Sequence, residues 1–173
     1  VDDLLQGVIV QSGNDASVAL AEHISGTEDV FASVMTDHAR KLGMTNSNFT
    51  NSTGLPDPDT YTTAKDMAVL SSALIREFPK LYARFDIQEF TYNNIRQSNR
   101  NRLLFLDESA DGLKTGHTEA AGYCLVSSAE RDGVRLISAV MGARSDTERT
   151  EASLTLINHG YRFFETRELY RDS

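Results

Sequence analysis

The chain has 173 residues, which suits one domain or most of one and is enough to bury a hydrophobic core. Apolar residues make up 40% and charged residues 24% of the sequence, which is ordinary globular usage and argues against extensive disorder. The formal net charge of −8 disfavours broad attraction to nucleic acid or anionic lipid.

The first half of the chain is predicted to be helical. Asp2 or Asp3 can cap a first helix, which stops at Ser12-Gly13-Asn14. A second helix follows from Asp15 and ends at Gly26.

The single cysteine of the chain, Cys124, excludes an internal disulfide and is expected to act as a small buried hydrophobe.

Two further helices are expected before residue 80. Thr27 caps one that ends at Gly43, with an apolar stripe formed by Val30, Phe31, Val34, Met35 and Leu42. Residues 44 to 62 are rich in Asn, Ser, Thr, Gly and Pro and predict a long surface loop. Thr63 and Asp66 then fit a capping pattern for a helix that ends at Pro79, with a buried face formed by Met67, Leu70, Leu74, Ile75 and Phe78.

The second half of the chain has the pattern of a sheet. Residues 87 to 92 predict a strand that turns at Asn93-Asn94, and Asp111-Gly112 predicts a turn before Leu113. Two strand-like runs, residues 121 to 129 and 134 to 142, are joined by Asp132-Gly133, which is a hairpin signal. A last helix begins near Asp146 and is expected to bury Leu154, Ile157, Tyr161 and Phe164.

This order predicts an α+β fold, with a mainly helical part over residues 1–85 and a sheet with a covering last helix over residues 86–173. No apolar run approaches the roughly 20 residues needed to span a bilayer. No metal-binding spacing of His, Cys or Glu is found, and no Gly-rich phosphate loop is present.

Two short motifs carry candidate chemistry. Ser12-Gly13-Asn14 presents a hydroxyl and a carboxamide together at a break between helices, although a helix cap with no other role gives the same pattern. Lys114-Thr115-Gly116 opens a strand, where a charge and a hydroxyl could bind a carboxylate, although an exposed turn has the same residues. The pair is more specific than either motif because both occur in one chain, about 100 residues apart.

The two motifs and their surroundings resemble the low-molecular-mass penicillin-binding proteins, the serine D-Ala-D-Ala carboxypeptidases of cell-wall metabolism. The resemblance rests on the runs Gly7–Ala16 and Asp111–Thr118, with further similarity at Asn99-Arg100-Asn101 and Tyr161–Phe164. It covers essentially the whole chain. It implies a β-lactamase/transpeptidase-like fold, of which the chain is a partial domain.

The resemblance also implies roles for individual residues. Ser12 would relay a proton, Asn14 would hydrogen-bond the substrate, and Lys114 would keep the site electropositive. Thr115 would bind the terminal carboxylate, and Gly116 would let the substrate lie against the strand.

Three further residues take part in the site that the resemblance implies. The backbone N–H of His117 would be one oxyanion donor, a group whose loss typically costs roughly 100- to 1000-fold in rate. Arg149 would lie near the substrate carboxylate and Arg100 near the rim of the pocket. For Arg149, an ordinary solvated position at the start of a helix is the alternative.

The family's first motif, Ser-x-x-Lys, holds the nucleophilic serine and its lysine base one helical turn apart. No serine in this sequence is followed three residues later by lysine. We therefore expect the chain to begin after this motif and to be inactive by itself. Ser12 does not replace the nucleophile, because the base is absent as well.

The resemblance implies an enzyme that removes the terminal D-Ala from peptidoglycan pentapeptides through an acyl-enzyme. The expected partners are stem peptides ending in D-Ala-D-Ala and β-lactam antibiotics, without nucleic acid, cofactor or metal. The expected location is periplasmic, at the outer face of the bacterial inner membrane, with any membrane anchoring supplied by segments outside this sequence.

Two alternatives remain open. A noncatalytic module that binds peptidoglycan peptides or a partner through the Lys114 strand would also lack Ser-x-x-Lys. A class A β-lactamase is disfavoured because Gly13 stands where that class typically has Asp.

Overall fold

The computed structural model describes residues 1–165. Its helices are α1 (Asp2–Gln11), α2 (Asn14–Ser25), α3 (Glu28–Lys41), α4 (Ala64–Glu77), α5 (Pro79–Tyr82), the 3₁₀ helix η1 (Ala83–Asp86), α6 (Leu103–Leu106) and α7 (Asp146–Phe163). Its strands are β1 (Glu89–Tyr92), β2 (Ile95–Ser98), β3 (Ala110–Thr118), β4 (Gly122–Arg131) and β5 (Val134–Ala143). The fold is α+β, as the sequence predicts.

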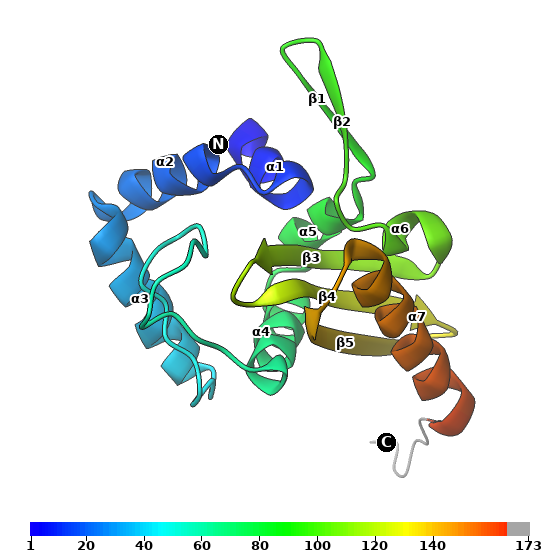
Figure 1. Cartoon of the computed structure of the whole chain (residues 1–173). Coiled ribbons are helices and arrows are strands. Elements are labelled where there is room, and N and C mark those ends of the chain that lie inside the picture. Colours follow the sequence, from blue (N-terminus) through cyan, green and yellow to red (C-terminus); the bar gives the residue numbers. More distant parts are fainter. Residues whose placement is uncertain (166–173) are drawn as a thin grey trace, which may run out of the picture.

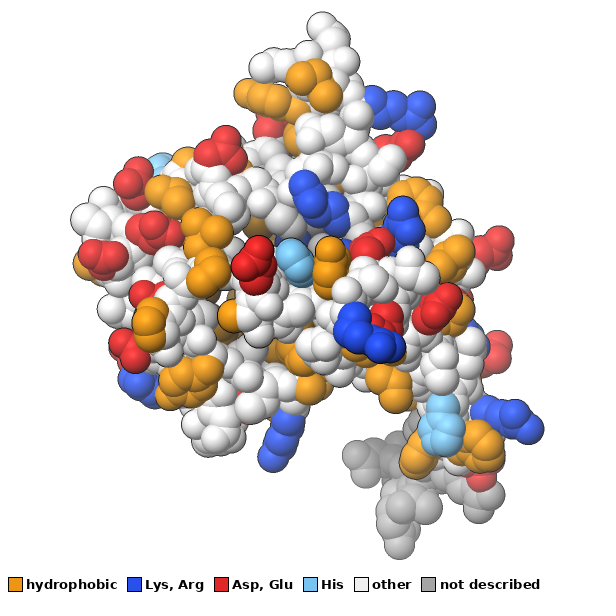
Figure 2. Space-filling model, in the orientation of Figure 1, with side chains coloured by type: hydrophobic (Ala, Val, Ile, Leu, Met, Phe, Trp, Pro, Cys, Tyr) orange, Lys and Arg blue, Asp and Glu red, His pale blue; other side chains and the backbone are white. Residues whose placement is uncertain are grey.

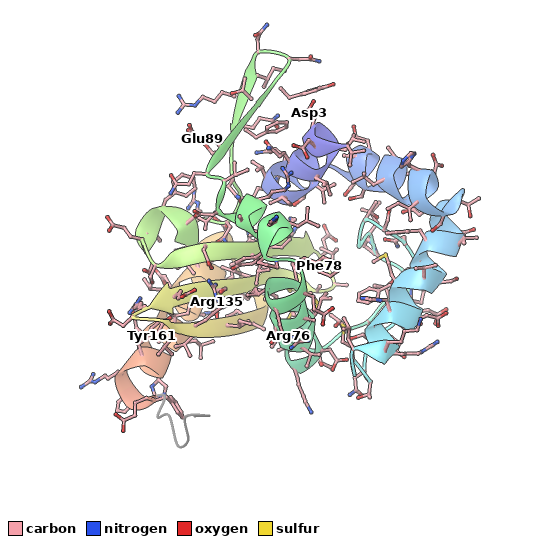
Figure 3. All side chains as sticks on the ribbon, turned by 180° about the vertical axis from the view of Figure 1, so that it is seen from behind. Asp3, Arg76, Phe78, Glu89, Arg135 and Tyr161 are labelled. Atoms are coloured by element: carbon pink, nitrogen blue, oxygen red, sulfur yellow. The ribbon has the colours of Figure 1, made fainter. Side chains whose placement is uncertain are left out.

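A three-stranded antiparallel sheet, in the order β3-β4-β5, forms the middle layer of the structure. Helix α7 crosses one face of this sheet (Figure 1), and α4 lies against the other face, as the view from behind shows (Figure 3). Among the described residues, β3 pairs with a strand on one side only. Gly116 and His117 of this strand are exposed, so its C-terminal part could pair with a ligand in extended conformation.

Each face of the sheet has its own hydrophobic cluster. The α7 side contains Leu103, Leu104, Ala110, Leu125, Ala129 and Ile157, with Leu154 and Tyr161 packed against them. The α4 side contains Tyr82, Leu113 and Val126, with partners that include Met67, Leu74 and Ile75. Because both faces are covered, the sheet is a rigid support for residues at its edge.

Helices α1, α2 and α3 form an arc beside this layered body (Figure 1). The loop of residues 44–62 folds back against α3 and is held by polar contacts. The carboxylate of Asp66 is buried and accepts hydrogen bonds from the backbone N–H of Asn46 and the hydroxyl of Ser47, at 2.8 and 2.7 Å. Thr36 on α3 exchanges hydrogen bonds with the backbone of Phe49.

Several local predictions are confirmed. Thr27 and Thr63 cap α3 and α4 through their side-chain oxygens, which accept from Val30 N and Asp66 N. The β1–β2 turn at Asn93-Asn94 and the β4–β5 turn at Asp132-Gly133 both use backbone with positive φ. This matches the handedness that tight hairpins require.

The predicted burial of four residues was wrong. Val30 and Val34 of the expected α3 stripe are exposed, and the residues that α3 buries are Ala32, Thr36 and Ala39. Phe78 and Phe164 are exposed because they lie just beyond the ends of α4 and α7. Figure 2 shows hydrophobic side chains at the surface of the arc that contains α2 and α3. The periodicity identified the helices but not the faces that the rest of the chain covers.

The Asp111-Gly112 turn was also wrong, because both residues lie inside β3. Gly112 is needed there for space, since a Cβ would come within 2.8 Å of the Tyr82 hydroxyl. The expected Asp2 or Asp3 cap was wrong as well: both lie in the first turn of α1, and Val1 precedes the helix without a side-chain cap. Acidic residues in a first turn are favoured by the helix dipole rather than by capping.

Strand β2 and the short helices α5, η1 and α6 were missed, because four-residue elements leave little periodicity to detect. Cys124, expected to be buried, is half-buried. The division near residue 86 remains a prediction. Over residues 1–165, no helix combines the length and the apolar character needed to cross a membrane.

Candidate active site

Ser12 stands at the break between α1 and α2 in an unusual backbone conformation. It has φ 57° and ψ 44°, in the left-handed region, and its N–H closes the end of α1 on Val8 O at 3.0 Å. A non-glycine residue in this conformation costs roughly 1 to 2 kcal/mol. This conformation ends α1 at Gln11, and α2 begins at Asn14 with Gly13 as its N-cap, so Ser12 lies at the junction of the two helices.

The end of strand β2 and the loop that follows it hold the end of α1 in place. The Arg100 N–H donates to Val10 O at 3.2 Å, and Gln11 Nε2 donates to Ser98 O at 2.7 Å. Two buried asparagines, Asn99 and Asn101, shape this loop through hydrogen bonds to nearby backbone groups. The position of Ser12 is therefore fixed by contacts to a segment almost 90 residues away.

Lys114 on β3 reaches Ser12. Its ammonium group donates to the Ser12 hydroxyl and to the carbonyl of Thr115, the latter at 2.9 Å. Burial, together with the positive charges of Arg100 and Arg149, lowers the pKa of Lys114 from 10.5 to about 8. The site therefore concentrates cationic groups in a desolvated place, which favours an anionic ligand.

The next three residues of β3 continue this edge of the site. Thr115 is buried, whereas Gly116 and His117 are exposed. The His117 ring lies 4.0 Å from the ring of Tyr123 on β4, centroid to centroid. The strand thus presents exposed backbone beside a charged lysine, an arrangement that can bind an extended peptide end.

Arg149 lies near the start of α7 and is buried, with a relative exposure of 6%. Its Nη1 donates to the carbonyls of Gly116 and Cys124, at 3.0 and 3.2 Å, and its Nη2 pairs with Asp146. The guanidinium also lies over the Tyr123 ring, 5.4 Å from the centroid. Arg149 therefore touches the backbone of both β3 and β4 at the site, which differs from a solvated position at a helix start.

The structure thus brings together most of the predicted residues. Ser12 and the Thr115 carbonyl accept hydrogen bonds from Lys114, and the charges of Arg100 and Arg149 act on it. Gly116 joins the group through its carbonyl, which accepts from Arg149. Asn14 is exposed at the first turn of α2, two residues from Ser12, and its side chain makes no hydrogen bond to any described residue.

Sequence reasoning missed Asp146 and Tyr123, the side-chain partners of Arg149. Asp146 gave one usable signal, because it lies three residues before Arg149 on the same helix and such pairs face each other. No sequence signal indicated Tyr123, because the contact of its ring with Arg149 depends on the pairing of β3 with β4.

An open depression of about 460 Å³ adjoins the site at the β3–β4 turn. Its lining includes His117, Glu119, Tyr123 and Arg144. In the part of the chain that the structure describes, no group of three or more His, Cys, Asp or Glu side chains is placed to hold a metal ion.

Comparison with known proteins agrees with this geometry. Residues 1–145 match the family model described as D-alanyl-D-alanine carboxypeptidase, peptidase S11. The chain is 50% identical over 167 residues to D-alanyl-D-alanine carboxypeptidase DacC of Escherichia coli, covering 96% of this chain and 42% of that protein. The chain therefore spans less than half the length of this curated relative.

Solved structures give the same result. Penicillin-binding protein 5 of Haemophilus influenzae matches with a TM-score of 0.91 and 46% identity, over 94% of this chain and 48% of that one. Penicillin-binding protein D2 of Listeria monocytogenes, in a cefotaxime-bound form, matches with a TM-score of 0.85 and 33% identity, over 92% and 65%. By sequence and by structure, the chain belongs to the D-alanyl-D-alanine carboxypeptidase family, peptidase S11.

Proposed function

We propose that the protein containing this chain is a serine-type D-alanyl-D-alanine carboxypeptidase that removes the terminal D-Ala from peptidoglycan pentapeptides. The observation that carries the proposal is the hydrogen bond from the Lys114 ammonium to the Ser12 hydroxyl. It joins the two family motifs at one place, beside the open edge of β3. Family membership supplies the reaction class.

In this proposal, β3 binds the C-terminal end of the peptide. Below its pKa of about 8, Lys114 carries the charge that attracts the terminal carboxylate. The Thr115 hydroxyl would hydrogen-bond the same carboxylate, while the absence of a side chain at Gly116 lets the peptide backbone approach. The His117 N–H would act as one donor to the oxyanion that forms when the scissile carbonyl is attacked.

Ser12 would act as a proton relay rather than as the nucleophile. Its hydroxyl accepts a hydrogen bond from Lys114 and retains its own proton for donation to a leaving amine. Asn14, two residues on, is placed at the start of α2 with its carboxamide unengaged by the described residues, and would hydrogen-bond the substrate amide.

The nucleophile itself would come from a Ser-x-x-Lys motif, which these 173 residues do not contain. The chain alone is therefore expected to form no acyl-enzyme. We extend the β-lactam binding of the cefotaxime-bound Listeria relative to this protein, because a β-lactam carboxylate would meet the same charged strand. A periplasmic location at the outer face of the inner membrane is part of the proposal, since the proposed substrate lies there.

Labelled penicillin tests this function directly. The intact protein that contains this chain should be acylated at a serine outside residues 1–173 and should release D-Ala from a D-Ala-D-Ala peptide. Replacing that serine with alanine should abolish labelling, while the 173-residue chain alone should stay unlabelled. An intact protein that neither labels nor hydrolyses the peptide would contradict the proposal.

A noncatalytic peptide-binding module is the second candidate, favoured by the absence of Ser-x-x-Lys from the sequence. The same experiment separates the two functions. A module would bind a D-Ala-D-Ala peptide reversibly in the intact protein without releasing D-Ala. Membership of the peptidase S11 family argues against the class A β-lactamase alternative.

A further inference from the structure

We propose that Asp146 is an internal competitor of the substrate carboxylate, and that it sets the affinity of the site by occupying Arg149 when no ligand is bound. The inference rests on the proposed function, because it assumes that a peptide carboxylate binds beside Lys114 and Arg149. Asp146 lies in the first turn of α7, three residues before Arg149, and its Oδ1 accepts from Arg149 Nη2.

The hydrogen bonds of Arg149 show which of its donors a ligand can use. A guanidinium has five N–H donors. Both donors of Nη1 are engaged by carbonyls, those of Gly116 and Cys124. Nε is buried and has no hydrogen-bond partner among the described residues. The Nε–Nη2 edge of Arg149 is therefore only half used, by Asp146 alone.

A buried polar donor without a partner is costly, so an unused Nε marks an edge that a ligand would complete. A carboxylate can satisfy Nε and Nη2 together in a two-bond fork. An incoming carboxylate would thus exchange one hydrogen bond to Asp146 for two to itself. Arg149 would be paired with an anion before and after the exchange, which avoids leaving a buried charge uncompensated.

Arg102 is a second cationic partner of Asp146. Its Nε lies 3.0 Å from Asp146 Oδ2, and its side chain is 64% exposed. Arg102 can therefore keep Asp146 paired after Arg149 turns to the ligand. Removal of Asp146 should strengthen ligand binding, whereas removal of Arg102 should weaken it, because Asp146 would then depend on Arg149 alone.

The test uses the intact protein that contains this chain and N-acetyl-D-alanine as the carboxylate probe, with its C-terminal amide as the uncharged control. Binding is followed by the NMR signal of the Arg149 Nε–H, which reports the proposed contact itself. D146N should lower the dissociation constant roughly 3- to 5-fold, the scale of one partly screened charge. R102Q should raise it by a similar factor, and neither variant should change binding of the amide.

Glu148→Gln is the matched control. It removes a neighbouring acid of the same helical turn that pairs with Arg144 and does not contact Arg149. Its dissociation constant should equal that of the wild type. Unchanged or weaker probe binding in D146N, or no binding in any variant, would overturn the proposal, as would R102Q binding more tightly.

The two proposals fail separately. Acylation of the wild-type protein by labelled penicillin reports the carboxypeptidase function and does not depend on Asp146. Opposite changes in the dissociation constant of the probe in D146N and R102Q report the competition between Asp146 and the ligand for Arg149. These measurements need no turnover. A fold disturbed by either substitution would appear as a lower Tm and a changed NMR spectrum beyond the site.

Discussion

The ammonium group of Lys114 donates a hydrogen bond to the hydroxyl of Ser12, which lies 102 residues earlier in the chain. The contact joins the β3 edge of the sheet to the junction of α1 and α2. It couples the helical part to the sheet at the proposed site, and it keeps a lysine in a buried place where its charge is costly.

Lys114→Met should stabilise the chain near pH 7 while abolishing carboxylate binding. The folded-state pKa of about 8 lies below the ordinary 10.5, so the unfolded state binds the proton more tightly. Burial of the charged lysine therefore costs most below pH 8, up to ~3 kcal/mol, and costs nothing above about pH 10.5. Loss of the Ser12 hydrogen bond offsets part of this, which leaves a gain of roughly 1 to 2 kcal/mol.

Urea unfolding of wild type and Lys114→Met between pH 7 and pH 10.5 measures this effect. The stability advantage of the variant should shrink steadily as pH rises through that window. If the stability advantage of Lys114→Met instead grew with pH, the fold would be stabilising the charged form of Lys114. That result would contradict a lowered pKa.

Ser12→Gly should be more stable than Ser12→Ala by roughly 1 kcal/mol. Both variants lose the hydroxyl that accepts from Lys114. Only glycine also removes the cost of the left-handed backbone at φ 57°. Equilibrium unfolding of the two variants gives the difference, and equal stabilities would show that this conformation is relaxed in the variants.

Gly112→Ala should destabilise the chain by roughly 1 to 3 kcal/mol, because the new methyl group overpacks the interior of β3. Its Cβ would lie 2.8 Å from the Tyr82 hydroxyl oxygen, a hydrogen-bond donor to Asp111. Tyr82→Phe removes that oxygen and should recover part of the loss. Asp111 would keep its bonds from Arg135, which lies on the sheet face seen in Figure 3.

A double-mutant cycle of Gly112→Ala and Tyr82→Phe measures the coupling. The double variant should be more stable than the sum of the two single effects predicts. Strict additivity would show that the collision is relieved by movement of β3, in which case labelled-penicillin acylation of the intact Gly112→Ala protein should fall with the displaced Lys114.

Thr115→Val should raise the KM of the intact protein for a D-Ala-terminated peptide about 10-fold, the size expected for one lost hydrogen bond to a charged group. Thr115→Ser keeps the hydroxyl and is the matched control. The effect should disappear for a peptide with an amidated C-terminus. An equal loss for acid and amide would contradict a role for Thr115 in carboxylate binding.

The longer helices, the β4–β5 hairpin and the two motifs were predictable from the sequence because their signals are local. Thr27 and Thr63 begin helices by capping their own first turns, and Asp132-Gly133 turns a hairpin through its own backbone. The sequence also showed that Ser-x-x-Lys is absent.

Only the tertiary structure decided which of these local features meet. Val30 and Val34 lie at helical spacing yet are exposed, because burial depends on what packs against a helix. The lowered pKa of Lys114 and the pairing of Asp146 with Arg102 arise from segments that are distant in sequence. Desolvation and charge act through space, so a linear pattern could nominate these residues but could not determine their environment.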